Sequence, residues 1–146
     1  MRGLIQRVTH ASVSVDGSIV GTINHGLLLL LGVQKNDAQQ QVDKLLQKII
    51  HYRVFSDEQG KMNNSLLDIN GELLIVSQFT LAADTQKGLR PGFSSAAEPA
   101  IAKELYHHFV EQAKSVDALK IQTGIFAADM QVSLVNDGPV TFLLET

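Results

Sequence analysis

Two hydroxyl groups and one amide directly follow a strongly apolar stretch of the chain, at Ser77, Gln78 and Thr80. The preceding residues, Leu73 to Val76, are typical of a buried strand. A buried strand that becomes polar at its end often delivers side chains and free backbone N–H groups into a cleft. The hydroxyl of Ser77 or Thr80 could act as a nucleophile, but it would need a neighbouring base, and the sequence assigns none. The alternative is that both hydroxyls only satisfy neighbouring backbone groups.

A second unusual segment lies close to the end of the chain, at Asn136 to Thr141, and contains the Gly138-Pro139 step. Proline lacks a backbone donor and has a fixed φ, so it is poorly tolerated inside a sheet. Residues 130–135 and 140–144 on either side are strand-like, and the intervening residue types favour a tight turn between two strands. The other interpretation is a rigid backbone element directed at a ligand.

The usual signatures of catalysis and of metal binding are missing. The sequence has no Gly-x-Ser-x-Gly elbow, no phosphate-binding glycine loop and no His-Glu-x-x-His motif. It has no cysteine, which excludes disulfides, thiolate nucleophiles and Cys-ligated zinc. No two histidines have the i, i+4 spacing of a helical metal site; they are His10, His25, His51, His107 and His108. We therefore expect neither a metal nor a cofactor.

Two helices are predicted to frame these segments. The first follows Asn36 or Asp37, either of which can cap it. Its apolar positions share one face at helical spacing: Val42, Leu45, Leu46, Ile49 and Ile50. The second is predicted to open at Ser95, which with Glu98 has the form of a capping box, and to end near Lys114. Its inward residues are expected to be Ile101, Leu105, Phe109 and Val110.

Strands account for most of the remaining chain. A loop is expected over residues 82–94, and a hairpin turn at Asp16-Gly17. The expected strands are residues 3–8, 11–15, 18–23, 26–33, 53–55, 72–81, 119–122, 130–135 and 140–144. Two helices among so many strands predict a single α+β domain over residues 1–146, with a strongly curved, barrel-like and mainly antiparallel sheet.

Composition limits the possible partners. The 146 residues are 45% hydrophobic and 18% charged, as in an ordinary globular protein, and the net charge is −3. An acidic balance disfavours binding to long stretches of nucleic-acid backbone, although contact with one RNA end stays open. The residues Lys87 to Arg90 could meet a few phosphates, or could be a solvated loop. The N-terminus lacks the apolar run of a signal peptide, and the longest apolar block, Leu27 to Val33, is too short to span a membrane. We expect a soluble, cytoplasmic protein.

Taken together, residues 77–81 (Ser-Gln-Phe-Thr-Leu) and 136–141 (Asn-Asp-Gly-Pro-Val-Thr) resemble the two-motif signature of D-aminoacyl-tRNA deacylases. The opening residues 1–8, the loop 87–93 and residues 122–130 also resemble family segments in the expected order, so the resemblance covers essentially the whole chain. Two departures are small-residue exchanges. Many members carry glycine in place of Ala127 and serine in place of Gly92.

The resemblance implies hydrolysis of the ester that joins a D-amino acid to the terminal adenosine of tRNA, and of glycine mischarged onto alanine tRNA. It implies that main-chain groups of Phe79 and Thr80, with Gln78 and Ser77 beside them, stabilise the oxyanion. The 2′-hydroxyl of the RNA would assist the attacking water, which would account for the missing histidine base. A competing mechanism makes Thr80 the nucleophile.

The resemblance also implies a homodimer whose two active sites lie at the subunit interface. The Gly138-Pro139 peptide would be cis and would enter the partner's site, where its fixed carbonyls would exclude L substituents. Phe126, Ala128 and Met130 would line the adenosine pocket, although packing into the core is an alternative for each of them. The implied partner is the 3′ end of an aminoacyl-tRNA, with no DNA and no membrane.

Two other functions are open from the sequence. One is a non-catalytic module that binds an RNA end. The other is a small-molecule binding protein in which the Gly-Pro step is a structural turn.

Overall fold

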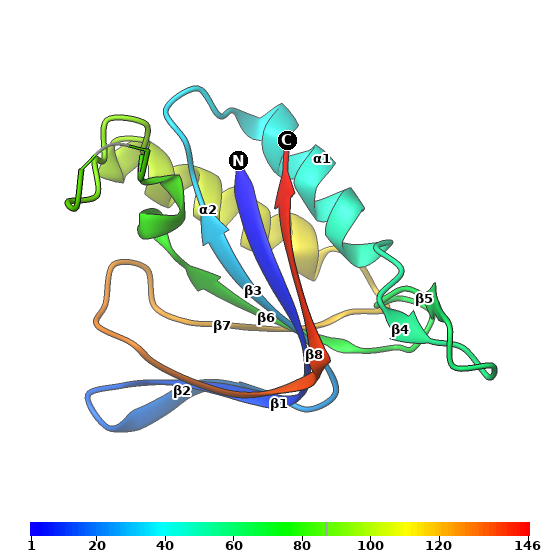
Figure 1. Cartoon of the computed structure of the whole chain (residues 1–146). Coiled ribbons are helices and arrows are strands. Elements are labelled where there is room, and N and C mark those ends of the chain that lie inside the picture. Colours follow the sequence, from blue (N-terminus) through cyan, green and yellow to red (C-terminus); the bar gives the residue numbers. More distant parts are fainter. Residues whose placement is uncertain (87) are drawn as a thin grey trace.

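A strongly curved six-stranded sheet forms the centre of the computed structural model, which describes residues 1–86 and 88–146 (Figure 1). Strand β1 pairs with β8 along one edge and with β3 and then β2 along the other. The order continues from β3 to β6 and β7. The strands of this sheet are β1 (Arg2–Val15), β2 (Ser18–Ile23), β3 (Gly26–Gly32), β6 (Glu72–Ser77), β7 (Lys120–Thr123) and β8 (Gln131–Glu145).

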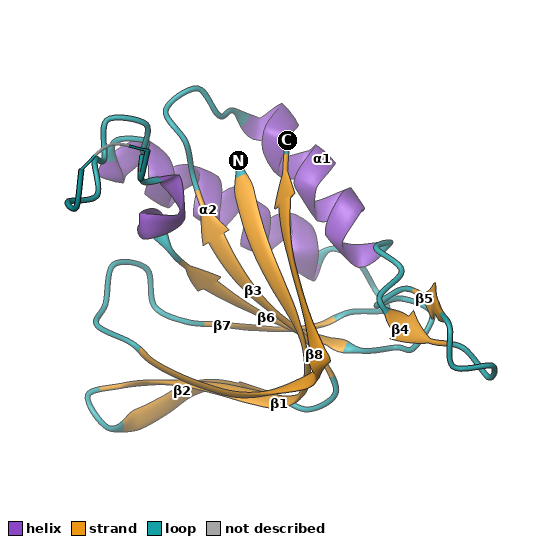
Figure 2. Ribbon diagram, viewed as in Figure 1, coloured by secondary structure: helices purple, strands orange, loops and turns teal. Residues whose placement is uncertain are grey.

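The sheet is mixed rather than purely antiparallel. All pairings of β1 are antiparallel, whereas β3–β6 and β6–β7 are parallel. Parallel neighbours need a crossover connection, and the two helices provide the crossovers, α1 (Gln39–Ile50) between β3 and β6 and α2 (Pro99–Lys114) between β6 and β7. Both helices cover the same face of the sheet (Figure 2). The predicted α+β class with a barrel-like sheet and two helices is confirmed.

The central strands are buried on both faces. Leu27, Leu29, Leu73 and Ile75 pack towards the helices in the main core. Leu28 and Leu74 alternate with them and pack in a second cluster inside the curl of the sheet. The strand predicted over residues 26–33 is therefore present as β3, and it is buried on both faces.

Helix α1 has the predicted buried face, formed by Val42, Leu45, Leu46, Ile49 and Ile50. Its predicted cap at Asn36 or Asp37 is wrong, because the N-cap residue is Ala38. The carboxylate of Asp37 has other partners: it accepts from the backbone N–H of Gln34 at 2.6 Å and pairs with the α-amine of Met1 at 2.5 Å.

Helix α2 begins at Pro99 and not at Ser95, so the predicted capping box is wrong. Proline at the first helical position needs no intrahelical partner for its nitrogen. The Ser95 hydroxyl instead donates to the backbone carbonyl of Ala82. Of the predicted inward residues, Leu105, Phe109 and Val110 are buried, but Ile101 is 45% exposed.

Strands β1 and β8 are each continuous, where the sequence predicted two shorter strands for each. In their ladder Gln6 pairs with Thr141 and Val8 pairs with Asn136, so residues 137–140 lie opposite the single residue Arg7. This is a bulge. The predicted turn at Asn136–Pro139 is wrong, because a bulge removes proline from the ladder without ending the strand.

Strand β6 ends at Ser77, and the chain turns into a short 3-10 helix, η1 (Phe79–Ala82), where the sequence predicted strand up to residue 81. The predicted strand 53–55 is displaced to β4 (Phe55–Ser56), which pairs with β5 (Met62–Asn64) in a separate small sheet. Lys87 of the predicted basic cluster lies outside the described residues. Within residues 1–86 and 88–146, no helix is long and apolar enough to cross a membrane.

Candidate active site

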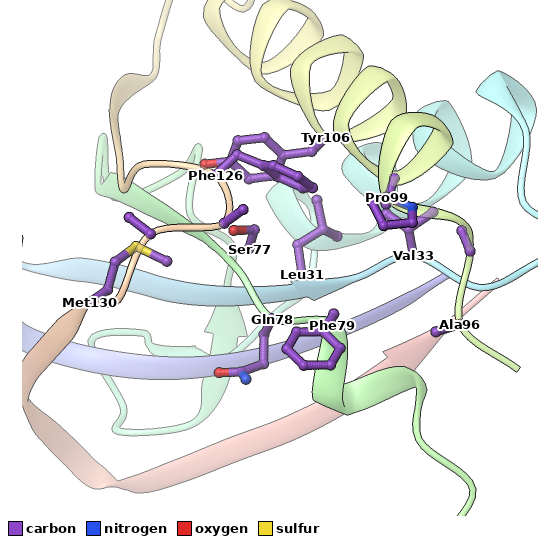
Figure 3. Close-up of a pocket in the computed structure, with 14 residues that line it drawn as sticks. Leu31, Val33, Ser77, Gln78, Phe79, Ala96, Pro99, Tyr106, Phe126 and Met130 are labelled. Carbon is purple, nitrogen blue, oxygen red and sulfur yellow. The ribbon is translucent and has the colours of Figure 1, made fainter. Parts of the chain in front are cut away.

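A cavity of about 480 Å³ opens where β3 and β6 end, under the first turns of α2. Figure 3 shows Tyr106 and Phe126 on one side of it, Gln78 and Phe79 on the opposite side, and Ser77 between them. Six of the predicted site residues line it: Ser77, Gln78, Phe79, Phe126, Ala128 and Met130. The sequence did not predict the other lining residues, which are Leu31, Val33, Ala96, Ala97, Pro99, Ala102, Tyr106 and Ala127.

The cavity wall has few groups that can transfer a proton. Among the described residues that line it, none is a histidine, aspartate, glutamate or lysine. The side chains that carry polar atoms are the Ser77 hydroxyl, the Gln78 amide and the Tyr106 phenol. The described wall therefore offers hydrogen-bonding groups and carries no charged side chain.

The residues 77–80 are held by the end of the parallel sheet. Ser77 pairs with Leu31 in the β3–β6 ladder, and the N–H of Gln78 donates to the carbonyl of Leu31 at 2.8 Å. Gly32 follows, where an added Cβ would lie 2.9 Å from the Cβ of Leu81. Glycine at this position therefore allows η1 to pack directly against the end of β3.

Two side chains from elsewhere fix η1 in place. The Arg2 guanidinium donates to the carbonyl of Leu81 at 2.9 Å, and the Ser95 hydroxyl donates to the carbonyl of Ala82. The first N–H groups of a helix have no partner within it. Phe79 and Thr80 open η1, and of these two residues Phe79 lines the cavity.

Thr80 does not belong to the cavity lining, in contrast to its neighbours. Its side chain is exposed, and its Oγ1 accepts a hydrogen bond from Nε2 of Gln78 at 2.6 Å. The contact orients the Gln78 amide and uses the Thr80 hydroxyl as an acceptor. Of the predicted residues 77–80, Thr80 is therefore the one that the structure leaves outside the cavity wall.

Tyr106 forms a wall of the cavity from helix α2. Its hydroxyl donates to the carbonyl of Ile75 at 3.1 Å, and its ring lies 5.5 Å from that of Phe126. Burial raises the pKa of Tyr106 to about 12, because a buried phenolate would lose its hydration. The phenol is therefore neutral at physiological pH and acts as an apolar wall with one anchoring hydrogen bond. Sequence periodicity alone did not distinguish it from a core tyrosine.

The connection between β7 and β8 continues the wall on which Tyr106 lies, through Phe126 (Figure 3). The N–H of Ala128 donates to the carbonyl of Ile125 at 3.2 Å, which closes a tight turn. Ala127 within this turn has φ +62°. That left-handed conformation favours glycine, so alanine is a strained residue at this position.

Gly138 and Pro139 lie outside this cavity, exposed in the bulge of β8. Their peptide bond is cis, and Gly138 has φ +149°. The Asn136 side chain spans the bulge, with Oδ1 accepting from the N–H of Val140 at 2.6 Å and Nδ2 donating to Oγ1 of Thr141 at 2.8 Å.

Arg7 supports the same bulge from the neighbouring strand. Its Nε donates to the carbonyl of Asp137 at 2.8 Å, and its Nη1 donates to the carbonyl of Val54 at 2.6 Å. The bulge is thus fixed by side chains on both sides. Within one chain, the structure does not bring the two sequence motifs together.

Comparisons with known proteins show the family of the chain. A family model described as D-Tyr-tRNA(Tyr) deacylase matches residues 4–145. A D-aminoacyl-tRNA deacylase of Cellvibrio japonicus is 62% identical over 145 residues, with 99% of both chains covered. One of Proteus mirabilis is 61% identical over 145 residues, with the same coverage.

Solved structures share the whole fold. One described as a c-Myc DNA unwinding element binding protein is 42% identical, with a TM-score of 0.95 over 100% of this chain and 99% of that one. A probable eukaryotic D-amino acid tRNA deacylase is 16% identical, with a TM-score of 0.80 over 99% of this chain and 98% of that one, and this likeness concerns the fold alone. The resemblance seen in the two sequence motifs thus holds over the full length, and the chain belongs to the D-Tyr-tRNA(Tyr) deacylase family.

Proposed function

We propose that the protein hydrolyses the ester bond of D-aminoacyl-tRNA and releases free tRNA and a D-amino acid. The observation that supports this proposal is that residues 77–79 line a cavity whose described wall residues offer hydrogen-bond donors and include no histidine, carboxylate or lysine. An aminoacyl ester is already activated, so its hydrolysis needs an oriented carbonyl and a stabilised oxyanion more than a strong nucleophile. The proposed place of action is the cytoplasm, where charged tRNA is used.

In this mechanism the terminal adenosine occupies the cavity beside Phe126, Ala128 and Met130. The ester carbonyl points to the amides of Phe79 and Thr80, and the Gln78 side chain lies beside them. Water adds to the carbonyl carbon with help from the ribose 2′-hydroxyl. The bond to the ribose oxygen then breaks, and this oxygen takes up the proton that the water has lost.

Chiral selection is assigned to Gly138 and Pro139 of a second subunit. A site that accepts many D side chains cannot depend on recognising them, so it needs a rigid wall where an L substituent would project. The carbonyls of this bulge suit that role because Arg7 and Asn136 hold the backbone in place. Glycine has no Cβ and would pass the wall, so glycyl-tRNA(Ala) is a further proposed substrate.

The proposal requires a homodimer, and the outer edge of β8 offers a surface for one. Strand β8 pairs only with β1 among the described residues. It exposes Val135 at 47%, Phe142 at 38% and Leu143 at 52%. A long apolar edge strand is normally covered. The exposed Gly138 and Pro139 lie on this same strand, where they can reach a partner.

A second candidate is a module that binds nucleic acid without catalysis. It is favoured by the description of the solved relative as a DNA unwinding element binding protein. The net charge of −3 disfavours extended contact with phosphates.

One experiment separates the two candidates. The protein is incubated with D-tyrosyl-tRNA and, in parallel, with L-tyrosyl-tRNA, and ester loss is followed over time. We expect rapid loss of the D ester and a stable L ester. Binding of both tRNAs with no loss of either ester would support the binding module and contradict the deacylase.

A further inference from the structure

Two phenyl rings lie exposed beside the cavity, at Phe79 and Phe93. Their centroids are 5.1 Å apart with the planes tilted by 44°, and the residues are 63% and 42% exposed. Exposed aromatic surface of this size is unfavourable in water unless a partner covers it. Phe79 also lines the cavity, where Figure 3 shows its ring next to Gln78. The aromatic pair is therefore continuous with the proposed substrate site.

The aromatic pair is held in position before any ligand arrives. Asp84 and Gly92 exchange two backbone hydrogen bonds, of 2.7 and 2.9 Å, which close the loop immediately before Phe93. The Ser95 hydroxyl ties the end of this loop to Ala82 in η1, the element that carries Phe79. The N–H of Ala96 also donates to the carbonyl of Phe93 at 3.1 Å. The two rings therefore lose little conformational freedom when a ligand binds, and the entropic cost of binding is small.

We propose that Phe79 and Phe93 form a stacking platform for the nucleobase that precedes the terminal adenosine of the tRNA. This rests on the proposed function, which places the terminal adenosine in the cavity next to Phe79. The 3′ end of tRNA is single-stranded, so the preceding base has a free face. Aromatic side chains bind single-stranded RNA by stacking on such faces, whatever the base.

Charge and position favour RNA over a second protein subunit as the occupant. The same loop carries Arg90, an exposed cation that suits the phosphate between the two last nucleotides. The surface proposed for a second copy is the outer edge of β8, with Phe142 and Leu143, whereas the aromatic pair belongs to η1 and the following loop. The two surfaces are thus on different elements.

The first test compares two variants of Phe93 on two substrates. Phe93→Leu removes the ring, and Phe93→Tyr keeps it as a matched control. On D-tyrosyl-tRNA we expect Phe93→Leu to lower kcat/KM by about 5-fold or more, the effect of losing one stacked base, and Phe93→Tyr to be near normal. On D-tyrosyl-adenosine, which lacks the preceding nucleotide, both variants should match the wild type. Equal losses on both substrates, or no loss on tRNA, would overturn the proposal.

The second test does not depend on catalysis. A short single-stranded RNA carries 2-aminopurine in place of the base before its terminal adenosine, and stacking quenches its fluorescence. We expect quenching by the wild type and by Phe93→Tyr, and at least about 5-fold weaker binding by Phe93→Leu. If the wild type hydrolyses neither D-tyrosyl-tRNA nor L-tyrosyl-tRNA but quenches the probe, the deacylase proposal is contradicted and the stacking platform is supported. Active enzyme without quenching, or a Phe93→Leu protein with altered oligomeric state, would contradict the platform.

Discussion

Ala127 is a single residue in a conformation that its own type disfavours. Its φ of +62° lies in the left-handed region, which costs a residue with a Cβ about 1–2 kcal/mol. Gly92, the other position at which the sequence departs from the family resemblance, is in a different situation. An added Cβ there would lie 3.7 Å from the carbonyl oxygen of Asp84, an ordinary contact. Serine therefore fits at position 92, and glycine fits better than alanine at position 127.

Replacing Ala127 by glycine is expected to stabilise the protein. Relief of the left-handed strain exceeds the extra flexibility of glycine in the unfolded chain, so we expect a gain of roughly 0.5–1 kcal/mol. Denaturant unfolding measures the gain. Ala128→Gly, next to it and without a positive φ, is the matched control and should lose stability. A loss of stability in both variants would contradict the strain at Ala127.

Tyr106 makes stability depend on pH in the alkaline range. Its pKa is raised to about 12, whereas in the unfolded chain it titrates near 10. Above pH 10 the unfolded state is stabilised by losing this proton, so this residue's contribution falls as pH rises towards 12. The unfolding free energy of the wild type, measured relative to that of Tyr106→Phe, should therefore fall over that range by on the order of 2 kcal/mol. A difference that is constant from pH 9 to 12 would show that the phenol is not buried.

The Thr80 hydroxyl distinguishes the two mechanisms, which are attack by a water that the RNA 2′-hydroxyl assists and attack by Thr80 itself. The Thr80→Ala variant keeps the backbone N–H and loses only the acceptor for Gln78. We expect the rate on D-tyrosyl-tRNA to stay within about 10-fold of the wild type, since loss of one neutral hydrogen bond costs about 1 kcal/mol. Thr80→Ser is the control that keeps the hydroxyl. A loss on the order of 10⁴-fold in the alanine variant alone, as for removal of a catalytic nucleophile, would assign the attack to Thr80.

At the scale of elements, the start of α2 shows where sequence signals compete. Ser95 and Glu98 have the spacing of a capping box, yet the Ser95 hydroxyl bonds to Ala82 instead. Ser95→Ala is therefore expected to loosen η1 and the following loop rather than the helix, at a cost of about 1 kcal/mol. Amide hydrogen exchange should accelerate there and stay unchanged in α2. Ser94→Ala, at an exposed neighbour, is the control. If exchange were faster only in the first turn of α2, Ser95 would act as a helix cap and the prediction would be contradicted.

The elements that sequence predicted well are those with a strong apolar pattern. The buried face of α1 follows from the helical spacing of its apolar residues, and β3 follows from a short continuous apolar run. The bulge in β8 was not predictable from local residues, since glycine, proline and asparagine suit a turn as well as a bulge. Its support by Arg7 depends on a partner strand 130 residues away along the chain.

The cavity itself was predicted only in part, because some of its wall comes from residues that are distant in the sequence. Residues 77–79 were expected at a site because of the family resemblance, since the polar end of an apolar strand also fits hydroxyls that only satisfy the backbone. Tyr106 and Ala102 line the cavity because α2 packs over the ends of β3 and β6, which is a tertiary placement. No local pattern distinguishes these two residues from others on the inner face of that helix.

For the molecule as a whole, the two motifs lie on different surfaces of one chain. Residues 77–79 line the cavity, whereas Gly138 and Pro139 are exposed on β8 and absent from its wall. A chain with a selective site would then need the bulge of another copy. Mixed dimers can test this, because they combine the cavity of one subunit with the bulge of the other.

Two variants make the mixed dimer informative. Pro139→Ala removes the selective wall and, as a homodimer that folds, is expected to hydrolyse L-tyrosyl-tRNA as well as the D ester. Ala102→Trp fills the cavity of its own subunit with a bulky ring and leaves the bulge intact. With excess Ala102→Trp subunits, each open cavity faces an intact Gly138-Pro139. We therefore expect L-ester hydrolysis per Pro139→Ala subunit to fall at least about 10-fold, the loss produced by 1.4 kcal/mol of discrimination, while D-ester hydrolysis persists.

The control for the mixed dimer is a subunit that carries both Ala102→Trp and Pro139→Ala. Mixed in the same excess, it supplies no intact bulge, so L-ester hydrolysis should remain at the level of the Pro139→Ala homodimer. If both mixtures keep the same L-ester rate, the wall acts within its own subunit or selection lies elsewhere. A fall in the first mixture alone requires that Gly138-Pro139 acts across the interface, because no other intact group distinguishes the two mixtures.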